Sequence, residues 1–421
     1  MANNMTEPEL QNMCEQARFL GFIPERLLRL DNMLESWVGE RRITQALAVR
    51  VNRHGQLAFE GAYGQRGCAE EEGSMTMDTI FPLCSHTKTI TAALMCILQE
   101  QGLLEFSQRA RLFLPELNPG YEDVRLWQLL SHSAGLHNGD VHNWVDSHIK
   151  DTLKLVKPER GAPDEEWDAL CLQIREKMYY PDMAPGENMR DDTFRRLAFA
   201  APPSFPPGTQ MVYAGVGYEV AGAIIEKMTG KTLEEAAREL LLEPLDMADT
   251  YWEIPAEKMP RFYRRGPRCE SWKWLSEGIL KNKAPDNGIK STARDMCRLV
   301  DMILGDGELE GARVLSPASV EMMLKNYNER LPVAFYNGEW LSPAWGLGWN
   351  VRCGKIDDAG MLRSDRSFEH GGYGGSKILG DPHFDVSIAF FGSHPAENPD
   401  WNWSGAHVNN MVFAAIGDMK A

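Results

Sequence analysis

The pattern of apolar and polar positions changes in type along the chain. Between residues 25 and 40 (ERLLRLDNMLESWVGE), apolar residues recur at helical spacing, which predicts an amphipathic helix. Residues 44 to 64 follow as two β-rich runs on either side of Arg53-His54-Gly55-Gln56, a pattern typical of a β-hairpin. Residues 81 to 104 (FPLCSHTKTITAALMCILQEQGLL) are then almost wholly apolar after a short polar start, and they predict a buried helix that begins near Ser85.

Strand patterns return only towards the other end of the chain, from about residue 334. They cover WGLGWNVRC (345 to 353), GGSKILG (374 to 380) and DVSIAFFGS (385 to 393), and the terminal stretch from Trp401 predicts a closing helix. Residues 105 to about 290 are mainly helical or loop in character, with several breaks marked by proline.

Strands that are distant in sequence but share one sheet imply an α+β body with an inserted helical domain. We therefore predict a discontinuous α/β domain formed by residues 1–104 and 290–421, with N- and C-terminal helices, and a mainly helical insert over residues 105–289. The chain shows neither internal repeats nor a low-complexity tract.

The apolar helix opens with a polar cluster that its buried position does not explain. Ser85 and Lys88 stand at i and i+3, where side chains share one face of a helix with Cβ atoms about 5–6 Å apart. A hydroxyl and an ammonium group are costly to bury unless they are partnered. The unpaired N–H groups and the dipole at a helix N-terminus also favour a developing oxyanion. This pattern points to a serine nucleophile with an amine beside it.

The Ser-x-x-Lys pattern alone is loose. Serine is a favoured helix N-cap, so a purely structural role stays open for Ser85 on this evidence. A second copy, Ser147-His-Ile-Lys150, lies in a polar and charged stretch, where both side chains are expected to be solvated.

Chemistry at Ser85 also needs a base. Free lysine and tyrosine side chains titrate near ~10, and lowering either pKa by three units costs roughly 4 kcal/mol. Burial and a neighbouring positive charge can impose such a shift. A lysine beside a tyrosine could achieve it jointly, because the ammonium favours the phenolate. The hypothesis therefore needs a tyrosine from elsewhere in the chain.

Several further segments occur in an order that matches a known superfamily. With the Ser-x-x-Lys element, they make the chain resemble the serine β-lactamase and penicillin-binding-protein superfamily, especially class C β-lactamases, family VIII carboxylesterases and related acyltransferases. The resemblance spans roughly residues 77 to 420. The segments that carry it are RLWQLLSHSAGL (125–136), FPPGTQMVYAGVGYEVAGAIIEKMTG (205–230), LLLEPLDMADTYW (240–252), STARDMCRLV (291–300), WGLGW (345–349) and EHGGYGGS (369–376).

The resemblance implies a fold and a set of site residues. The fold would be β-lactamase/transpeptidase-like, an α/β sandwich in which helices flank an antiparallel sheet. Ser85 would be the acylated nucleophile, Lys88 its partner base, and Tyr213 the residue that shares the proton and later activates water or an alcohol. The backbone N–H groups of Ser85 and Tyr373 would form the oxyanion hole. The edge strand that lines the site would carry His370, Gly371 and Gly372.

Two departures from the family pattern bear on substrate. The family's Tyr-x-Asn reads Tyr213-Ala214-Gly215 here, and Gly215 has no amide to hydrogen-bond a substrate's acylamino group. His370 replaces a fixed lysine charge and is mostly neutral at pH 7, which weakens recognition of a β-lactam carboxylate. Both departures favour esters as substrates.

Composition excludes several other classes of function. A net charge of −16, from 60 acidic and 44 basic residues, argues against binding nucleic acid or an anionic membrane. The N-terminal sequence lacks a signal-peptide pattern, and no apolar run approaches the ~20 residues that span a bilayer. The eight cysteines are scattered, as expected of free thiols in a cytoplasmic protein. The ten histidines suggest no metal site. We predict neither metal nor cofactor, and oligomeric state stays open.

Some motifs are interpreted as structural. Residues 229–232 (TGKT) lack the glycine that a nucleotide-binding loop needs at position 225, and residues 131–135 (SHSAG) lack the first glycine of a G-x-S-x-G elbow. Most tryptophans are expected in the core or between domains, although some of those between residues 140 and 280 could line an apolar acyl or aryl pocket. The tryptophans considered are Trp144, Trp167, Trp252, Trp272, Trp274, Trp340, Trp345 and Trp349.

Together these observations predict a serine hydrolase that forms an acyl-enzyme, with carboxylesterase activity on small esters. An acyltransferase would use the same intermediate, and sequence hardly separates the two. A β-lactamase or D-amino-acid peptidase is the alternative within the same class. A non-catalytic binding or scaffold protein that kept the fold is the alternative from a different class, and the presence of Ser85, Lys88 and Tyr213 argues against it.

Overall fold

The computed structural model describes most of the chain. The described residues are 7–67, 73–159, 161–179, 189–267, 269, 271–332, 342–393 and 403–418. Trp340 and Cys68, considered in the sequence analysis, lie outside them, as does the side chain of Trp272.

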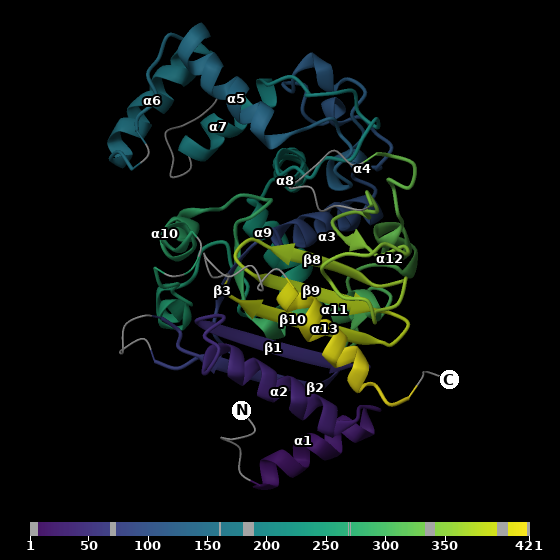
Figure 1. Ribbon diagram of the computed structural model, residues 1–421. Helices are drawn as coiled ribbons and strands as arrows, with labels where there is room; N and C mark the ends of the chain where they lie inside the picture. The colour runs from purple at the N-terminus through teal and green to yellow at the C-terminus, as the bar shows by residue number, and fades with distance from the viewer. Residues whose placement is uncertain are drawn as a thin grey trace.

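A six-stranded antiparallel sheet joins the two ends of the chain, in the order β2-β1-β10-β9-β8-β7 (Figure 1). Val49 of β1 pairs with Phe390 of β10, so strands more than 300 residues apart are neighbours. The bounds are β1 Ala46–Arg53, β2 Gln56–Gly64, β7 Asn350–Val351, β8 Phe368–Gly372, β9 Ser376–Asp381 and β10 Val386–Gly392. The predicted α+β class and antiparallel sheet are confirmed.

The hairpin of β1 and β2 turns where the sequence indicates. His54 and Gly55 both have positive φ, 53° and 68°, as a two-residue hairpin turn requires. The segment 345–353 differs from prediction, because only Asn350 and Val351 form a strand there. Gly348, at φ +81°, lies against helix α3, so close that a Cβ would be 2.5 Å from the Cβ of Ala92. Packing on the helix therefore replaces strand pairing in the first half of this segment.

Each face of the sheet packs on its own set of helices. Leu47, Val49 and Val51 of β1 point into one core with α1 (Glu7–Phe19), α2 (Pro24–Val38) and α13 (Ser404–Ala415). The alternate residues Ala46 and Ala48 point into a larger core that contains α3 (Thr87–Glu100) and α11 (Ala293–Leu304). Figure 1 shows α2 and α13 on one side of the sheet and α3 and α11 behind it. The pleat of the strands fixes this division.

Residues between the two groups of strands are mainly helical. A short pair, β3 (Phe81–Cys84) and β4 (Ile289–Ser291), links the start of this block to its end. The remaining α-helices and strands of the described residues are α4 Leu126–Leu130, α5 Asn138–Ser147, α6 Asp164–Lys177, α7 Met189–Ala200, α8 Val216–Thr229, α9 Leu233–Ala237, α10 Trp272–Ser276, β5 Glu308–Leu309, β6 Ala312–Arg313 and α12 Pro317–Leu324. None of the helices in the described residues combines the length and the apolar character that crossing a membrane requires.

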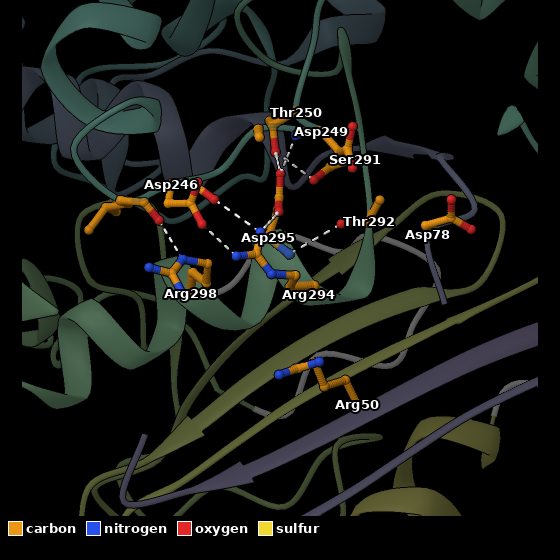
Figure 2. Close-up of polar contacts among 12 residues, drawn as sticks. Arg50, Asp78, Asp246, Asp249, Thr250, Ser291, Thr292, Arg294, Asp295 and Arg298 are labelled. Atoms are coloured by element: carbon orange, nitrogen blue, oxygen red, sulfur yellow. Dashed lines mark hydrogen bonds and ion pairs between the residues drawn. The ribbon is translucent and has the colours of Figure 1, made fainter. Parts of the chain in front are cut away.

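A buried carboxylate ties α11 to residues 249 and 250. Thr292 caps α11 by accepting a hydrogen bond from the backbone N–H of Asp295. The Asp295 carboxylate, 1% exposed, accepts from the backbone N–H of Asp249 at 2.7 Å and from the Thr250 hydroxyl at 3.0 Å (Figure 2). Thr250 also contacts the hydroxyl of Ser291, the last residue of β4, at 2.7 Å. The network therefore ties residues 249 and 250 to both the start of α11 and the end of β4.

We predict that Asp295→Ala lowers the free energy of unfolding by about 1–3 kcal/mol, because it removes the acceptor of the hydrogen bonds from Asp249 N–H and the Thr250 hydroxyl. The control is Asp246→Asn, which removes the charge of an exposed partner of Arg294, the neighbour of Asp295 in α11 (Figure 2). Asparagine tolerates the left-handed φ of 48° at this position, so the change should cost less than about 1 kcal/mol. Denaturant unfolding of the two variants measures the difference. Equal losses would show that the Asp295 carboxylate does not stabilise the loop.

Candidate active site

Ser85 lies in the turn between β3 and α3, with its side chain partly exposed. Helix α3 begins at Thr87, two residues later than the sequence predicts, so Ser85 precedes the first helical residue. Cys84, directly before it, has a left-handed φ of 50°, which is uncommon for a residue with a side chain. The Thr87 hydroxyl donates to the carbonyl of Cys84 at 2.6 Å and helps to hold this turn. The turn places the Ser85 hydroxyl at the N-terminal end of a helix that is buried from Thr87 to Leu98.

Lys88 is buried on the first turn of α3, only 1% exposed. Its ammonium Nζ donates to Ser85 Oγ at 3.3 Å and to the carbonyl oxygen of Asp286 at 2.8 Å. The Asp286 carboxylate lies 3.4 Å from the same Nζ. The rings of Tyr213 and Tyr218 complete the surroundings, with centroids 5.0 and 5.5 Å from Nζ. These partners explain how a charged group is tolerated among apolar residues.

Electrostatics keep Lys88 protonated. Burial lowers the pKa of Lys88, but interactions with Tyr213 and Asp286 outweigh burial, and the net effect is a pKa above the usual value. A group whose pKa is raised stays protonated at neutral pH, so Lys88 is an ammonium there. In this state it can donate hydrogen bonds and stabilise negative charge. The role of partner base, which the family resemblance implies for Lys88, would need the neutral amine instead.

Tyr213 reaches the site from the loop that precedes α8. The N-terminus of α8 is held by Asn138, whose side-chain oxygen accepts from the backbone N–H groups of Gly215 and Val216. The Tyr213 ring packs against His132 and Trp345, at centroid distances of 4.4 and 5.7 Å. Since Tyr213 both hydrogen-bonds Lys88 and lies over its ammonium, the structure brings the predicted hydroxyl, amine and phenol together.

The end of β8 forms another side of the site. A Cβ on Gly372 would lie 2.3 Å from the carbonyl oxygen of Leu83, so only glycine lets β8 pass this close to the Ser85 turn. His370 is buried, with its ring 6.3 Å from that of Tyr213, and Gly371 follows it in β8. Tyr373, whose backbone N–H is the second expected oxyanion donor, comes directly after β8. Its hydroxyl contacts Ser271 at 2.7 Å.

Three buried histidines near Lys88 are neutral. Burial, together with the charge of Lys88, lowers the pKa of His370 to about 3. Burial likewise lowers the pKa values of His86 and His132 well below the usual value, and neighbouring positive or titratable groups add to the effect. Nδ1 of His132 accepts from the backbone N–H of Ala214 at 3.1 Å, next to Tyr213. These rings therefore line the site without adding positive charge at neutral pH.

Other sequence features fall outside this cluster. Ser147 and Lys150 are both exposed, which agrees with their interpretation as surface residues. The TGKT segment forms a helix-to-helix turn, in which Gly230 ends α8 at φ 68° and Thr232 caps α9. Among the tryptophans, Trp345 packs on Tyr213, whereas Trp252 lines a separate cavity of about 840 Å³ that also contains the charged side chains of Arg195 and Glu219.

Asp286 is the site residue that sequence reasoning missed. It contacts Lys88 through both its carbonyl and its carboxylate, yet it lies in the loop KAPDNGIK, which carries none of the motifs that mark Ser85 or Tyr213. The signal that could have identified Asp286 is its position shortly before the STARDM motif, which begins at Ser291, the last residue of β4.

The sequence pattern of the family described as Beta-lactamase matches residues 34–402, most of the chain. The chain belongs to this family. The family is one of serine hydrolases, and its relatives and structural neighbours include esterases, acyltransferases and penicillin-binding proteins. The Ser85 turn, Lys88 and Tyr213 all lie inside the matched region.

Individual relatives are distant. Esterase EstB from Burkholderia gladioli is 30% identical over 228 residues, 52% of this chain and 50% of that protein. The N-acetylmuramyl-L-alanine amidase of Bacillus subtilis (strain 168) is 23% identical over 446 residues, covering 95% of this chain and 88% of that protein. Simvastatin synthase from Aspergillus terreus has the same fold, with a TM-score of 0.68, 17% identity, and coverage of 92% of this chain and 98% of that one.

We predict that Tyr213→Phe lowers the rate of acylation by about 10²–10⁴, the usual contribution of a proton-transferring side chain. Tyr218→Phe is the matched control, because its ring also lies over Lys88 but its hydroxyl donates to the carbonyl of Leu130. We expect a loss of less than about tenfold from Tyr218→Phe, together with a small loss of stability from the missing hydrogen bond. Single-turnover kinetics with a chromogenic ester separate the two. Equal losses of acylation rate in the two variants would contradict a proton-transfer role that belongs to Tyr213 and not to Tyr218.

Proposed function

We propose that this member of the beta-lactamase family is a carboxylesterase that forms an acyl-enzyme on Ser85. The observation that carries the proposal is the bridge made by Lys88, whose buried ammonium contacts Ser85 Oγ and interacts with Tyr213. An ammonium in this position stabilises a phenolate, and a phenolate is the base that a serine nucleophile needs.

The reaction would then proceed in two steps. Ser85 Oγ attacks the ester carbonyl carbon while its proton passes to the oxygen of Tyr213, and the backbone N–H groups of Ser85 and Tyr373 hold the oxyanion. The C–O bond to the alcohol breaks, and the alcohol leaves with the proton from Tyr213. Water then attacks the acyl group in the same way and releases the carboxylic acid and free Ser85. Lys88 remains protonated throughout and acts by its charge and hydrogen bonds.

Esters are favoured over β-lactams and D-amino-acid peptides for two reasons. Position 215 is a glycine and cannot donate an amide hydrogen bond to an acylamino group. His370 is neutral, since its pKa is lowered to about 3, and supplies no positive charge for a carboxylate. The similarity to an esterase supports the same choice, although the match covers only half of that protein.

Covalent labelling tests the proposal. We predict that a fluorophosphonate probe, and a panel of p-nitrophenyl esters analysed by mass spectrometry, modify one residue, Ser85. Ser85→Ala should abolish both labelling and ester turnover. Ser147→Ala is the control, because it removes the serine of the second Ser-x-x-Lys from the exposed surface and should leave both unchanged.

The outcomes separate the alternatives. Labelling on another residue, or none, would contradict an acyl-enzyme on Ser85 and favour a non-catalytic protein. Nitrocefin turnover that equals ester turnover would contradict the preference for esters. Adding an alcohol acceptor to the ester assay distinguishes hydrolysis from acyl transfer, because transfer yields a new ester in place of the acid.

A further inference from the structure

Gly215 is a glycine because another residue fills the space beside it. A Cβ built on Gly215 would lie 2.2 Å from Oδ2 and 2.9 Å from Cγ of Asp286. The backbone of Gly215, at φ −75° and ψ −33°, is one that any residue adopts. The backbone conformation therefore does not require glycine at position 215. Glycine is required because the carboxylate of Asp286 already occupies the volume that a side chain at this position would need.

The backbone around Asp286 is held in place by α3. The Thr91 hydroxyl donates to the carbonyl of Pro285 at 2.7 Å, and the ammonium of Lys88 donates to the carbonyl of Asp286 at 2.8 Å. Where the loop enters β4, the backbone N–H of Ile289 donates to the Thr87 hydroxyl at 3.0 Å. Thr87, Lys88 and Thr91 lie within about one turn on the same face of α3. The loop therefore has little freedom to withdraw Asp286 from Gly215.

The side chain of Asp286 meets a charge requirement of the site. Its carboxylate is 13% exposed and lies 3.4 Å from Nζ of Lys88, which is 1% exposed. A buried ammonium is stabilised by an opposite charge at this distance. The carboxylate is also a hydrogen-bond acceptor only, whereas an amide can both donate and accept. The side chain that fills the space beside position 215 thus offers acceptor oxygens and has no donor group of its own.

We propose that Asp286 and Gly215 form an exchanged pair, in which the Asp286 side chain occupies the space that a side chain at position 215 would take. From there its carboxylate positions Lys88. Because this carboxylate only accepts hydrogen bonds, it disfavours acyl groups that would place an amide carbonyl beside it. The pair therefore favours esters whose acyl group carries no acylamino substituent. The inference rests on the proposed function for its substrate class. The geometric exchange between the two positions stands independently of it.

Four proteins test the exchange: the wild type, Gly215→Asn, Asp286→Ala, and the double variant. Asp286→Ala should lower kcat on p-nitrophenyl butyrate by about tenfold to a hundredfold with little change in KM, as expected when a catalytic group is misplaced. Gly215→Asn alone should lower both kcat and the melting temperature, because the new side chain overlaps the Asp286 carboxylate. The double variant should be faster than either single variant, since the introduced amide side chain then fits and its oxygen can accept from Lys88.

Two further readouts separate positioning from simple structural support. Asp286→Asn keeps the shape and one acceptor but removes the charge, so its kcat should fall between those of the wild type and Asp286→Ala. The double variant should also raise the ratio of nitrocefin to ester turnover by about tenfold, because it restores an amide donor at position 215. An unchanged kcat in Asp286→Ala would overturn the positioning role. A double variant no better than its worse parent would overturn the exchange.

Failure of the esterase proposal can be told apart from failure of the exchange between Asp286 and Gly215. If the wild type neither turns over esters nor labels at Ser85, the proposed function fails, but the exchange is still measured by melting temperatures. The double variant should then recover the stability that Gly215→Asn loses. If it does not, the two side chains do not compete for one space and the inference fails on its own terms.

Discussion

The site depends on one buried ammonium. Lys88 enters an otherwise apolar helix core, where an unpartnered charge would cost several kcal/mol. Its partners come from three separate parts of the chain: Ser85 in the turn before α3, Tyr213 in the loop before α8, and Asp286 in the loop before β4. The requirement to satisfy this charge therefore fixes the relative positions of these segments, and the same arrangement gives the serine its chemical environment.

The scaffold supplies that arrangement by close backbone packing. Gly372 allows β8 to approach the Ser85 turn, and Gly217 allows α8 to approach α4, where a Cβ would lie 2.7 Å from the carbonyl of Leu129. Pairing of β3 with β4 brings the two ends of the helical block together. The buried Asp295 of α11 binds residues 249 and 250, and Thr250 in turn contacts Ser291 at the end of β4 (Figure 2). Rigid elements of this kind can keep catalytic groups within the narrow tolerance that catalysis needs.

Sequence alone predicted the parts whose signals are local. The hairpin of β1 and β2 has its turn at His54 and Gly55, and the apolar run after Ser85 could only be a buried helix. Ser85, Lys88 and Tyr213 were identifiable because they lie in motifs of fixed spacing. Asp286 was not, because its role comes from long-range packing: nothing near it in sequence shows that it lies against Gly215 and Lys88. The strand expected at 345–353 was shortened for a similar reason, by packing of Gly348 on α3.

The central claim, that Lys88 is an ammonium held by its partners, is tested most directly by NMR titration of the protein labelled with ¹³C at lysine Cε. The Lys88 signal is assigned by its loss in Lys88→Arg. Lys290 and Lys355 provide internal references, because burial lowers the pKa of Lys290 to about 7 and that of Lys355 to about 8. The account predicts that both references titrate while Lys88 keeps its ammonium shift up to about pH 10, near the pKa of an ordinary lysine. A Lys88 signal that is already a neutral amine at pH 7 would contradict it.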